Sequence, residues 1–95
     1  MILSFADKET ELVFTGFVSK KLPINIQQLA RIKLKRINYA KSLNDLILPP
    51  GNKLEALKGK RLGRWSIRIN KQWKITFTPI NSGRDYTDVK IEDYH

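Results

Sequence analysis

Strict alternation of apolar and polar residues from Arg64 to Phe77 is the feature that most restricts the fold. Side chains of a β-strand point alternately to its two faces, so a period of two predicts strands. The apolar residues of this stretch are Trp65, Ile67, Ile69, Trp73, Ile75 and Phe77. The polar run Asn70-Lys71-Gln72 divides the stretch and predicts a turn. We therefore expect an antiparallel hairpin whose apolar face, both tryptophans included, packs in the core.

The opposite parity of the predicted hairpin is polar and cationic. It carries Arg64, Arg68, Asn70 and Lys74 within one small area. A surface of this kind binds a phosphate chain through its charge. A half-buried sheet also has a solvated polar face in proteins that bind no nucleic acid. The hairpin alone leaves both interpretations open.

The rest of the chain predicts two helices and three further strands. In order, these are a strand at residues 2–5, a helix from Asp7 to Gly16, a helix from Asn25 to about Lys41, a brief strand at residues 54–59 and a last strand from Tyr86 to His95. Asp7 and Asn25 are residue types that cap helix N-termini. The order β-α-α-β-β-β-β predicts a single α+β domain, residues 1–95, in which two helices cover one side of a largely antiparallel, twisted sheet.

Side-chain periodicity indicates what two of these elements bury. In the longer helix an apolar stripe, interrupted by Lys33, consists of Ile26, Leu29, Ala30, Ile37 and Ala40. We expect this stripe to pack on the sheet. In the last strand Asp93 shares the parity of Val89 and Ile91, so regular alternation predicts that Asp93 points toward the core side. A β-bulge would be needed to present it differently.

The charge of the chain favours a polyanionic partner. Its 95 residues include 18 Lys and Arg against 9 Asp and Glu, which gives a net charge of +9. This excess is larger than solubility requires. Nucleic acid is a better match for it than a membrane surface.

Residue types that the chain lacks exclude several kinds of site. Without cysteine there are no disulfides or thiolate zinc sites, and one histidine cannot build a histidine metal cluster. No metal cofactor is therefore expected. The apolar start of the chain is too short for a signal peptide, and no apolar run approaches the length of a membrane span. These features predict a protein of the reducing cytoplasm with no membrane partner.

Several motifs together resemble one family of bacterial proteins. They are Leu54-Glu55-Ala56-Leu57-Lys58-Gly59, Gly63-Arg64-Trp65-Ser66-Ile67-Arg68-Ile69-Asn70, Gln72-Trp73-Lys74-Ile75-Thr76-Phe77 and the ending Glu92-Asp93-Tyr94-His95. In this combination the chain resembles the HigB toxins of bacterial toxin–antitoxin modules, within the RelE/ParE superfamily, over its whole length. The resemblance implies a RelE-like fold and an endoribonuclease that cuts messenger RNA on the translating 70S ribosome. It also implies a HigA-type helix-turn-helix antitoxin as the inhibitor.

The resemblance assigns functional positions as well. Those that match the catalytic positions are Lys58, Asp93, Tyr94 and His95, and those that match or flank the phosphate-binding ones are Arg68, Asn70 and Lys74. RNA cleavage without metal requires a deprotonated 2′-hydroxyl, a stabilised phosphorane and a protonated leaving oxygen. His95 would serve as acid or base, with Asp93 supporting it. Lys58 and Arg68 would stabilise the transition-state charge. Tyr94 would stack on a base or donate a hydrogen bond.

Further basic residues are expected to form a diffuse electrostatic field toward ribosomal RNA. They are Lys20, Lys21, Lys60, Arg61 and Arg64. The alternative role of such residues is simple solubility.

Two positions depart from the family pattern. Lys74 stands where members often carry arginine, and lysine keeps the charge without the bidentate fork of a guanidinium. Glu55 stands where some members carry histidine. The departures concern phosphate binding and acid–base chemistry.

Two other functions remain open from the sequence. One is a ParE-like protein that poisons DNA gyrase by binding it, although the Asp93-Tyr94-His95 ending counts against this. The other is a non-catalytic nucleic-acid-binding module that uses the basic sheet face. Convergence of His95, Asp93 and Lys58 beside Arg68 would favour the nuclease, because a passive binder has no reason to gather titratable groups there.

Overall fold

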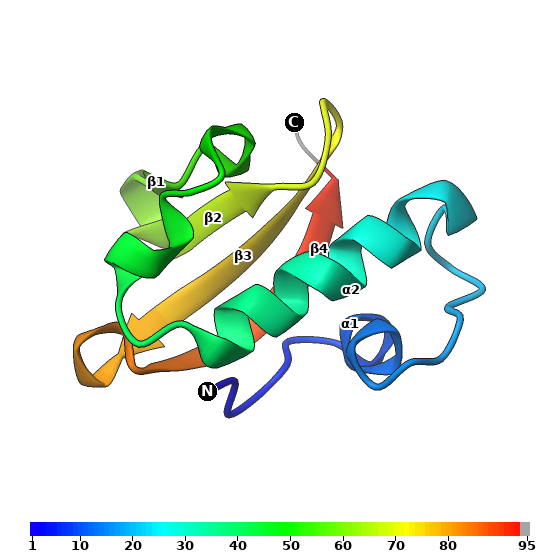
Figure 1. Ribbon diagram of the computed structural model, residues 1–95, viewed down its shortest axis with the longest axis horizontal. Coiled ribbons are helices and arrows are strands. Elements are labelled where there is room, and N and C mark those ends of the chain that lie inside the picture. Colours follow the sequence, from blue (N-terminus) through cyan, green and yellow to red (C-terminus); the bar gives the residue numbers. More distant parts are fainter. Residues whose placement is uncertain (94–95) are drawn as a thin grey trace.

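The computed structural model describes residues 1–93 and consists of two helices packed on one face of a four-stranded antiparallel sheet (Figure 1). The helices are α1 (Lys8–Phe14) and α2 (Ile24–Tyr39), and the strands, in their order across the sheet, are β1 (Glu55–Ala56), β2 (Trp65–Arg68), β3 (Trp73–Ile80) and β4 (Asp85–Asp93). Short 3₁₀ turns are η1 (Leu43–Leu46), η2 (Pro50–Asn52), η3 (Gly59–Arg61) and η4 (Asn81–Gly83). The predicted α+β fold is confirmed. None of the helices within residues 1–93 has the length and hydropathy needed to cross a membrane.

The predicted hairpin forms as β2 and β3, with Ile67 opposite Ile75 and Arg68 opposite Lys74. Ile67 and Ile75 are fully buried, while both tryptophans are half-buried and pack against the core. The turn is closed by the side-chain oxygen of Asn70, which accepts backbone hydrogen bonds from Gln72 at 2.8 Å and Trp73 at 2.7 Å. Alternation thus predicted the strands and the face that packs in the core, but Ser66, Lys74 and Thr76 on the opposite face are buried as well.

The buried stripe of α2 differs from the prediction at two positions. Leu29 is 42% exposed, whereas Lys33 is buried. The other buried side chains of the helix are Ile26, Gln27, Ala30, Leu34 and Ile37. Residues 26, 30, 33 and 37 follow the spacing of one helix face, so residue 29 falls at its flank. The ammonium group of Lys33 donates a 2.6 Å hydrogen bond to the side-chain oxygen of Asn52.

The N-terminal part of the chain corrects two further predictions. No strand forms at residues 2–5, where Ile2 and Phe5 make only isolated parallel bridges to β4. Asp7 caps α1 as expected, because its carboxylate accepts a 2.9 Å hydrogen bond from the backbone N–H of Thr10. Asn25 does not cap α2, which begins one residue earlier at Ile24, and within the described residues no side chain bonds to that helix end.

A β-bulge in β4 separates the two halves of the strand. Thr76 lies opposite Lys90 and Thr78 opposite Thr87, so the register shifts by one residue, and Asp88 between them has a positive φ of 51°. From Lys90 to Asp93 alternation is regular. Asp93 pairs with Trp73 on the helix-covered face, as its parity predicted.

Candidate functional site

Polar side chains form two rows on the face of the sheet opposite the helices. One row consists of Glu55, Ser66, Thr76 and Lys90, and the other consists of Arg68, Lys74 and Glu92. Neighbouring strands of a sheet lie about 4.8 Å apart, so members of a row are close neighbours across the strands. The register therefore brings together residues that are distant in sequence.

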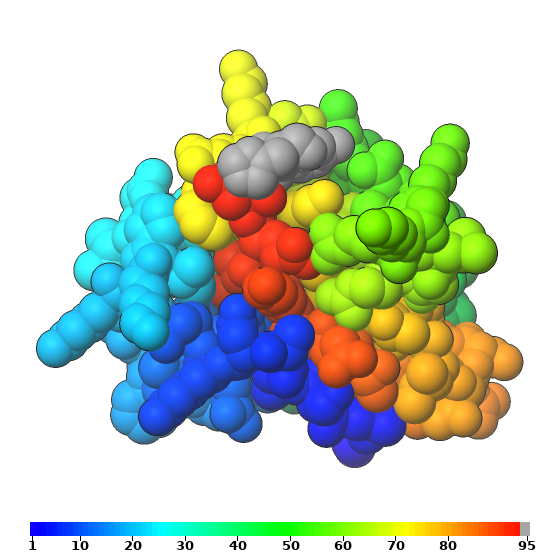
Figure 2. All heavy atoms as spheres, turned by 180° about the vertical axis from the view of Figure 1, so that it is seen from behind, coloured from blue at the N-terminus to red at the C-terminus, as the bar shows by residue number. Residues whose placement is uncertain are grey.

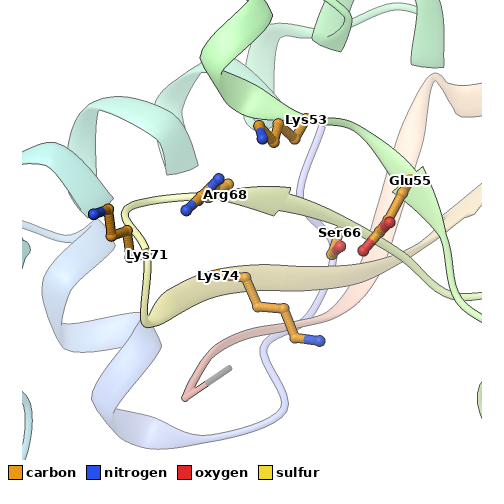
Figure 3. A pocket seen from close by; sticks show the side chains of 6 residues that line it. All are labelled: Lys53, Glu55, Ser66, Arg68, Lys71 and Lys74. Carbon is orange, nitrogen blue, oxygen red and sulfur yellow. The ribbon is translucent and has the colours of Figure 1, made fainter. Parts of the chain in front are cut away.

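A hollow of about 340 Å³ opens between the two rows. Its walls are formed by Lys53, Glu55, Ser66, Arg68, Lys71 and Lys74 (Figure 3). Figure 3 shows Glu55 and Ser66 together on one side and Lys71 on the other, with Arg68 and Lys74 on adjacent strands. Four cations and one carboxylate line the described part of this hollow. Such a lining attracts a phosphate group and also supplies a proton acceptor.

The local structure of the chain places three of these cations at the hollow. Lys53 follows η2 in a left-handed conformation with φ of 44°. Lys71 belongs to the β2–β3 turn. Arg68 donates a 2.9 Å hydrogen bond from Nε to the backbone oxygen of Asn70, which fixes the direction of its guanidinium group. The hairpin turn thus positions two cations of the hollow together.

A hydrogen-bonded cluster beside the hollow joins β3, β4 and the loop that follows β1. Glu92 is held by the guanidinium group of Arg61 and by the hydroxyl of Thr76. Arg64 donates 2.7 Å and 3.1 Å hydrogen bonds to the hydroxyls of Thr76 and Thr78, and a 2.8 Å bond to the backbone oxygen at the bulge. We refer to Arg61, Arg64, Thr76 and Glu92 as the Glu92 cluster.

Two charged members of the Glu92 cluster have shifted pKa values. Burial acts to raise the pKa of Glu92, but the hydrogen bonds from Arg61 and Thr76 and the positive charges of Arg61 and Lys90 outweigh it and lower the pKa below 4.5. Burial first, and then the neighbouring charge of Arg61, lowers the pKa of Arg64. Glu92 is therefore a carboxylate that the fold holds in its ionised form.

Of the predicted catalytic residues within the described chain, neither is in the hollow. Lys58 is exposed in the loop before η3, where its backbone oxygen accepts a 3.3 Å hydrogen bond from the N–H of Arg61. The carboxylate of Asp93, on the helix-covered face, accepts a 3.2 Å hydrogen bond from Gln72. Tyr94 and His95 lie outside the described residues. Lys58 and Asp93 therefore do not line the hollow with Arg68, and a convergence that includes His95 stays a prediction.

The predicted binding residues occupy several different environments. Arg68 and Lys74 are adjacent in the hollow, whereas the side-chain oxygen of Asn70 is used to close the turn. Lys60 is exposed. Lys20 and Lys21 line a separate hollow beside α1. Arg61 and Arg64, expected to face ribosomal RNA, instead engage the sheet through the Glu92 cluster.

Comparison with known proteins places the chain in a family. A family model described as RelE-like toxin of type II toxin-antitoxin system HigB matches residues 3–95. The chain belongs to this HigB toxin family. Its relatives include Toxin HigB-1 of Vibrio cholerae, 37% identical over 78 residues that cover 81% of this chain and 82% of that protein. Endoribonuclease HigB of Proteus vulgaris is 36% identical over 95 residues, which is all of both chains.

Solved structures show the same fold in other toxins. The Staphylococcus aureus YoeB–YefM complex matches with a TM-score of 0.56 and 19% identity, over 100% of this chain and 95% of that chain. The YoeB/ParE toxin of Agrobacterium tumefaciens matches with a TM-score of 0.52 and 17% identity, over 96% of each. Membership of a toxin–antitoxin family makes an antitoxin the partner of this HigB-family chain.

Sequence reasoning missed four residues of this HigB-family site. Ser66 and Glu92 share strand parity with Arg68 and Lys90, so alternation carried a signal for both. Lys53 and Lys71 lie in turns, where no periodicity exists to reveal them. Glu92 directly precedes the Asp93-Tyr94-His95 ending, and the resemblance assigns it no role.

Proposed function

We propose that this HigB-family toxin is a ribosome-dependent endoribonuclease that cuts messenger RNA and thereby inhibits translation in the cytoplasm. The observation that carries the proposal is the hollow in which Arg68 and Lys74 lie on adjacent strands opposite Glu55. The Proteus vulgaris relative named Endoribonuclease HigB, which aligns over the whole chain, supports the reaction type.

In the proposed reaction the scissile phosphate lies against Arg68 and Lys74. Their charges neutralise the negative charge that develops when the ribose 2′-oxygen attacks phosphorus, which is the kind of electrostatic stabilisation that contributes most in a preorganised site. The attack forms a bond from the 2′-oxygen to phosphorus and breaks the bond to the 5′-oxygen. One group must accept the 2′-hydroxyl proton and another must donate a proton to the leaving 5′-oxygen.

The acid–base groups of the proposal are His95, supported by Asp93, and the carboxylate of Glu55. Glu55 belongs to the described lining of the hollow and stands where some family members carry histidine. Lys58 supplies positive charge from its loop, and Tyr94 contacts a base or donates a hydrogen bond. No step of this mechanism requires a metal ion.

Basic residues outside the hollow support the proposed macromolecular partners. Lys20, Lys21 and Lys60 are exposed cations on a chain of net charge +9. They would draw the toxin to ribosomal RNA in a salt-dependent way. A HigA-type helix-turn-helix antitoxin with an acidic contact segment would compete electrostatically for the same charge.

The test is to induce wild type, Arg68→Ala and His95→Ala from a repressed promoter and to map the 5′ ends of cellular messenger RNA. Arg84→Ala is the matched control, because it removes an exposed arginine at the opposite end of the sheet. We expect new 5′ ends inside translated frames with wild type and Arg84→Ala, and far fewer with the other two variants. Growth arrest with intact messages and linearised DNA would replace the proposal with gyrase poisoning.

A further inference from the structure

The ion pair of Arg61 and Glu92 links two segments that carry expected catalytic residues. Arg61 belongs to the loop at residues 57–63, which contains Lys58, and Glu92 precedes Asp93 at the end of β4. Figure 2 shows the end of β4 in red with the yellow-green residues of this loop beside it. This side-chain contact therefore connects the two segments.

The backbone hydrogen bonds described for the loop do not attach its middle part to the sheet. At its ends, the Leu57 N–H donates to the Arg64 backbone oxygen at 2.9 Å and the Arg64 N–H donates to the Arg61 backbone oxygen at 3.0 Å. Between them, the described backbone bonds of η3 stay within the loop. Leu62 is 82% exposed, so burial of its side chain does not anchor the loop.

The sheet, by contrast, holds Glu92 firmly. Its backbone pairs with Lys74 in the regular part of β4, and its carboxylate accepts a hydrogen bond from the hydroxyl of Thr76. Thr76 is fully buried and also accepts a 2.7 Å hydrogen bond from Arg64. Glu92 therefore presents a fixed acceptor to the partly exposed side chain of Arg61, whose planar guanidinium group suits a carboxylate.

We propose that Glu92 is a positioning residue that, through Arg61, holds the loop carrying Lys58 in a fixed place relative to the end of β4. The proposal rests on the proposed nuclease function for its catalytic consequence, but its structural consequence is independent of that function. Glu92 touches no substrate in this scheme. Its effect on the reaction comes from the placement of Lys58, because a displacement of about 1 Å costs up to about 100-fold in rate.

The structural arm of the test measures hydrogen exchange in free protein. Glu92→Gln keeps the shape of the side chain and removes the charge that binds Arg61, and Arg61→Ala removes the partner from a partly exposed position. We expect amides of residues 58–62 to exchange about 10-fold faster in both variants, while those of Ile67 and Ile75 stay unchanged. Unchanged exchange in the loop would overturn the proposal.

The matched control is Asp85→Asn, which weakens another β4 ion pair, that with the N-terminal ammonium at 3.6 Å, at the far end of the strand. This variant should leave the exchange of residues 58–62 unchanged. Faster loop exchange in Asp85→Asn would mean that general destabilisation, and not the Arg61 contact, frees the loop. If Glu92→Gln fails to fold, Arg61→Ala decides the structural arm.

The catalytic arm measures cleavage on programmed ribosomes. We expect Glu92→Gln and Arg61→Ala to lower kcat by about 10- to 100-fold with no increase in KM, since neither loss removes a cation of the hollow. Arg61→Lys should recover part of kcat, and Asp85→Asn should match wild type. Wild-type kcat in Glu92→Gln would refute the positioning role. A wild-type protein without cleavage would refute the nuclease function instead, while the exchange result would still decide the loop contact.

Discussion

Lys33 of α2 donates a 2.6 Å hydrogen bond to the side-chain oxygen of Asn52, and both side chains are buried. The amide nitrogen of Asn52 in turn donates to the backbone oxygens of Leu46 at 3.1 Å and Leu48 at 3.2 Å. Burial first, and the nearby charge of Arg36 second, lowers the pKa of Lys33. This contact ties α2 to the segment that leads into the hollow.

Asn52→Ala should lower the free energy of unfolding by about 1–3 kcal/mol, because it leaves the buried ammonium of Lys33 and two backbone oxygens without their partner. Urea unfolding of wild type, Asn52→Ala and Asn44→Ala would measure this. Asn44 is an exposed residue of the same segment and serves as the control. Equal stability of the two variants would show that the buried contact contributes nothing.

The stability of the protein should depend on Glu92 in a pH-dependent way. Its pKa is lowered in the folded state, below its ordinary value of 4.5, because the bonds and charges around it outweigh burial. The folded protein therefore gains stability from this carboxylate above pH 4.5 and loses it as pH falls through the folded pKa. The stability difference between wild type and Glu92→Gln should be largest near neutral pH and should shrink in acid.

The control for this pH dependence is the same comparison in an Arg61→Ala background. Without the guanidinium group, Glu92 loses a hydrogen bond and a charge that lower its pKa. The acid-dependent part of the stability difference should then become smaller. Thermal unfolding between pH 3 and pH 7, roughly the range in which carboxylates titrate, would measure the effect of Glu92→Gln in the wild-type and in the Arg61→Ala background. Identical pH dependence in the two backgrounds would remove Arg61 as the cause.

Local periodicity predicted the parts of the fold that depend on neighbouring residues. The hairpin, the cap at Asp7 and the inward parity of Asp93 all follow from short-range pattern and agree with the structure. The strand expected at residues 2–5 does not form. This segment makes two isolated bridges to β4, which is distant in sequence, and short-range pattern does not show how such a segment pairs. Lys33 interrupts the apolar stripe in the sequence, yet it is buried because Asn52 from another segment accepts its hydrogen bond.

The site was harder to predict because register, and not sequence spacing, assembles it. Arg68 and Lys74 were found since the turn between them is short and fixes their pairing. The neighbours of Glu92 come from a loop thirty-one positions earlier and a strand sixteen positions earlier. Sequence alone therefore identified the cationic face of the hairpin, but not Glu92, the carboxylate that binds Arg61 and Thr76 beside it.

Arg68→Ala should reduce the salt dependence of RNA binding. With a single-stranded RNA whose 2′-hydroxyls are methylated, loss of one phosphate contact should lower the slope of log K against log salt by about 0.7. Filter binding at several salt concentrations would give the slope. Arg84→Ala removes the same charge from an exposed position outside the hollow and should leave the slope near that of wild type. Equal slopes for all three proteins would place the phosphate elsewhere.

Glu55 provides the sharpest test of the acid–base chemistry. Its carboxylate belongs to the described wall of the hollow, opposite Ser66 in register and close to Arg68 and Lys74. If it accepts the 2′-hydroxyl proton, Glu55→Gln should lower kcat by about 10²- to 10⁴-fold, because the amide keeps the shape and cannot take a proton.

Glu55→His should retain cleavage, with the acid limb of its pH–rate profile moved to higher pH. A histidine titrates about two units above a carboxylate in ordinary surroundings, so it loses its basic form at a higher pH as the solution is acidified. Single-turnover rates of wild type and both variants across pH would show the shift. A Glu55→Gln variant with wild-type rates would assign the proton acceptor to another residue and leave Glu55 as a wall of the hollow only.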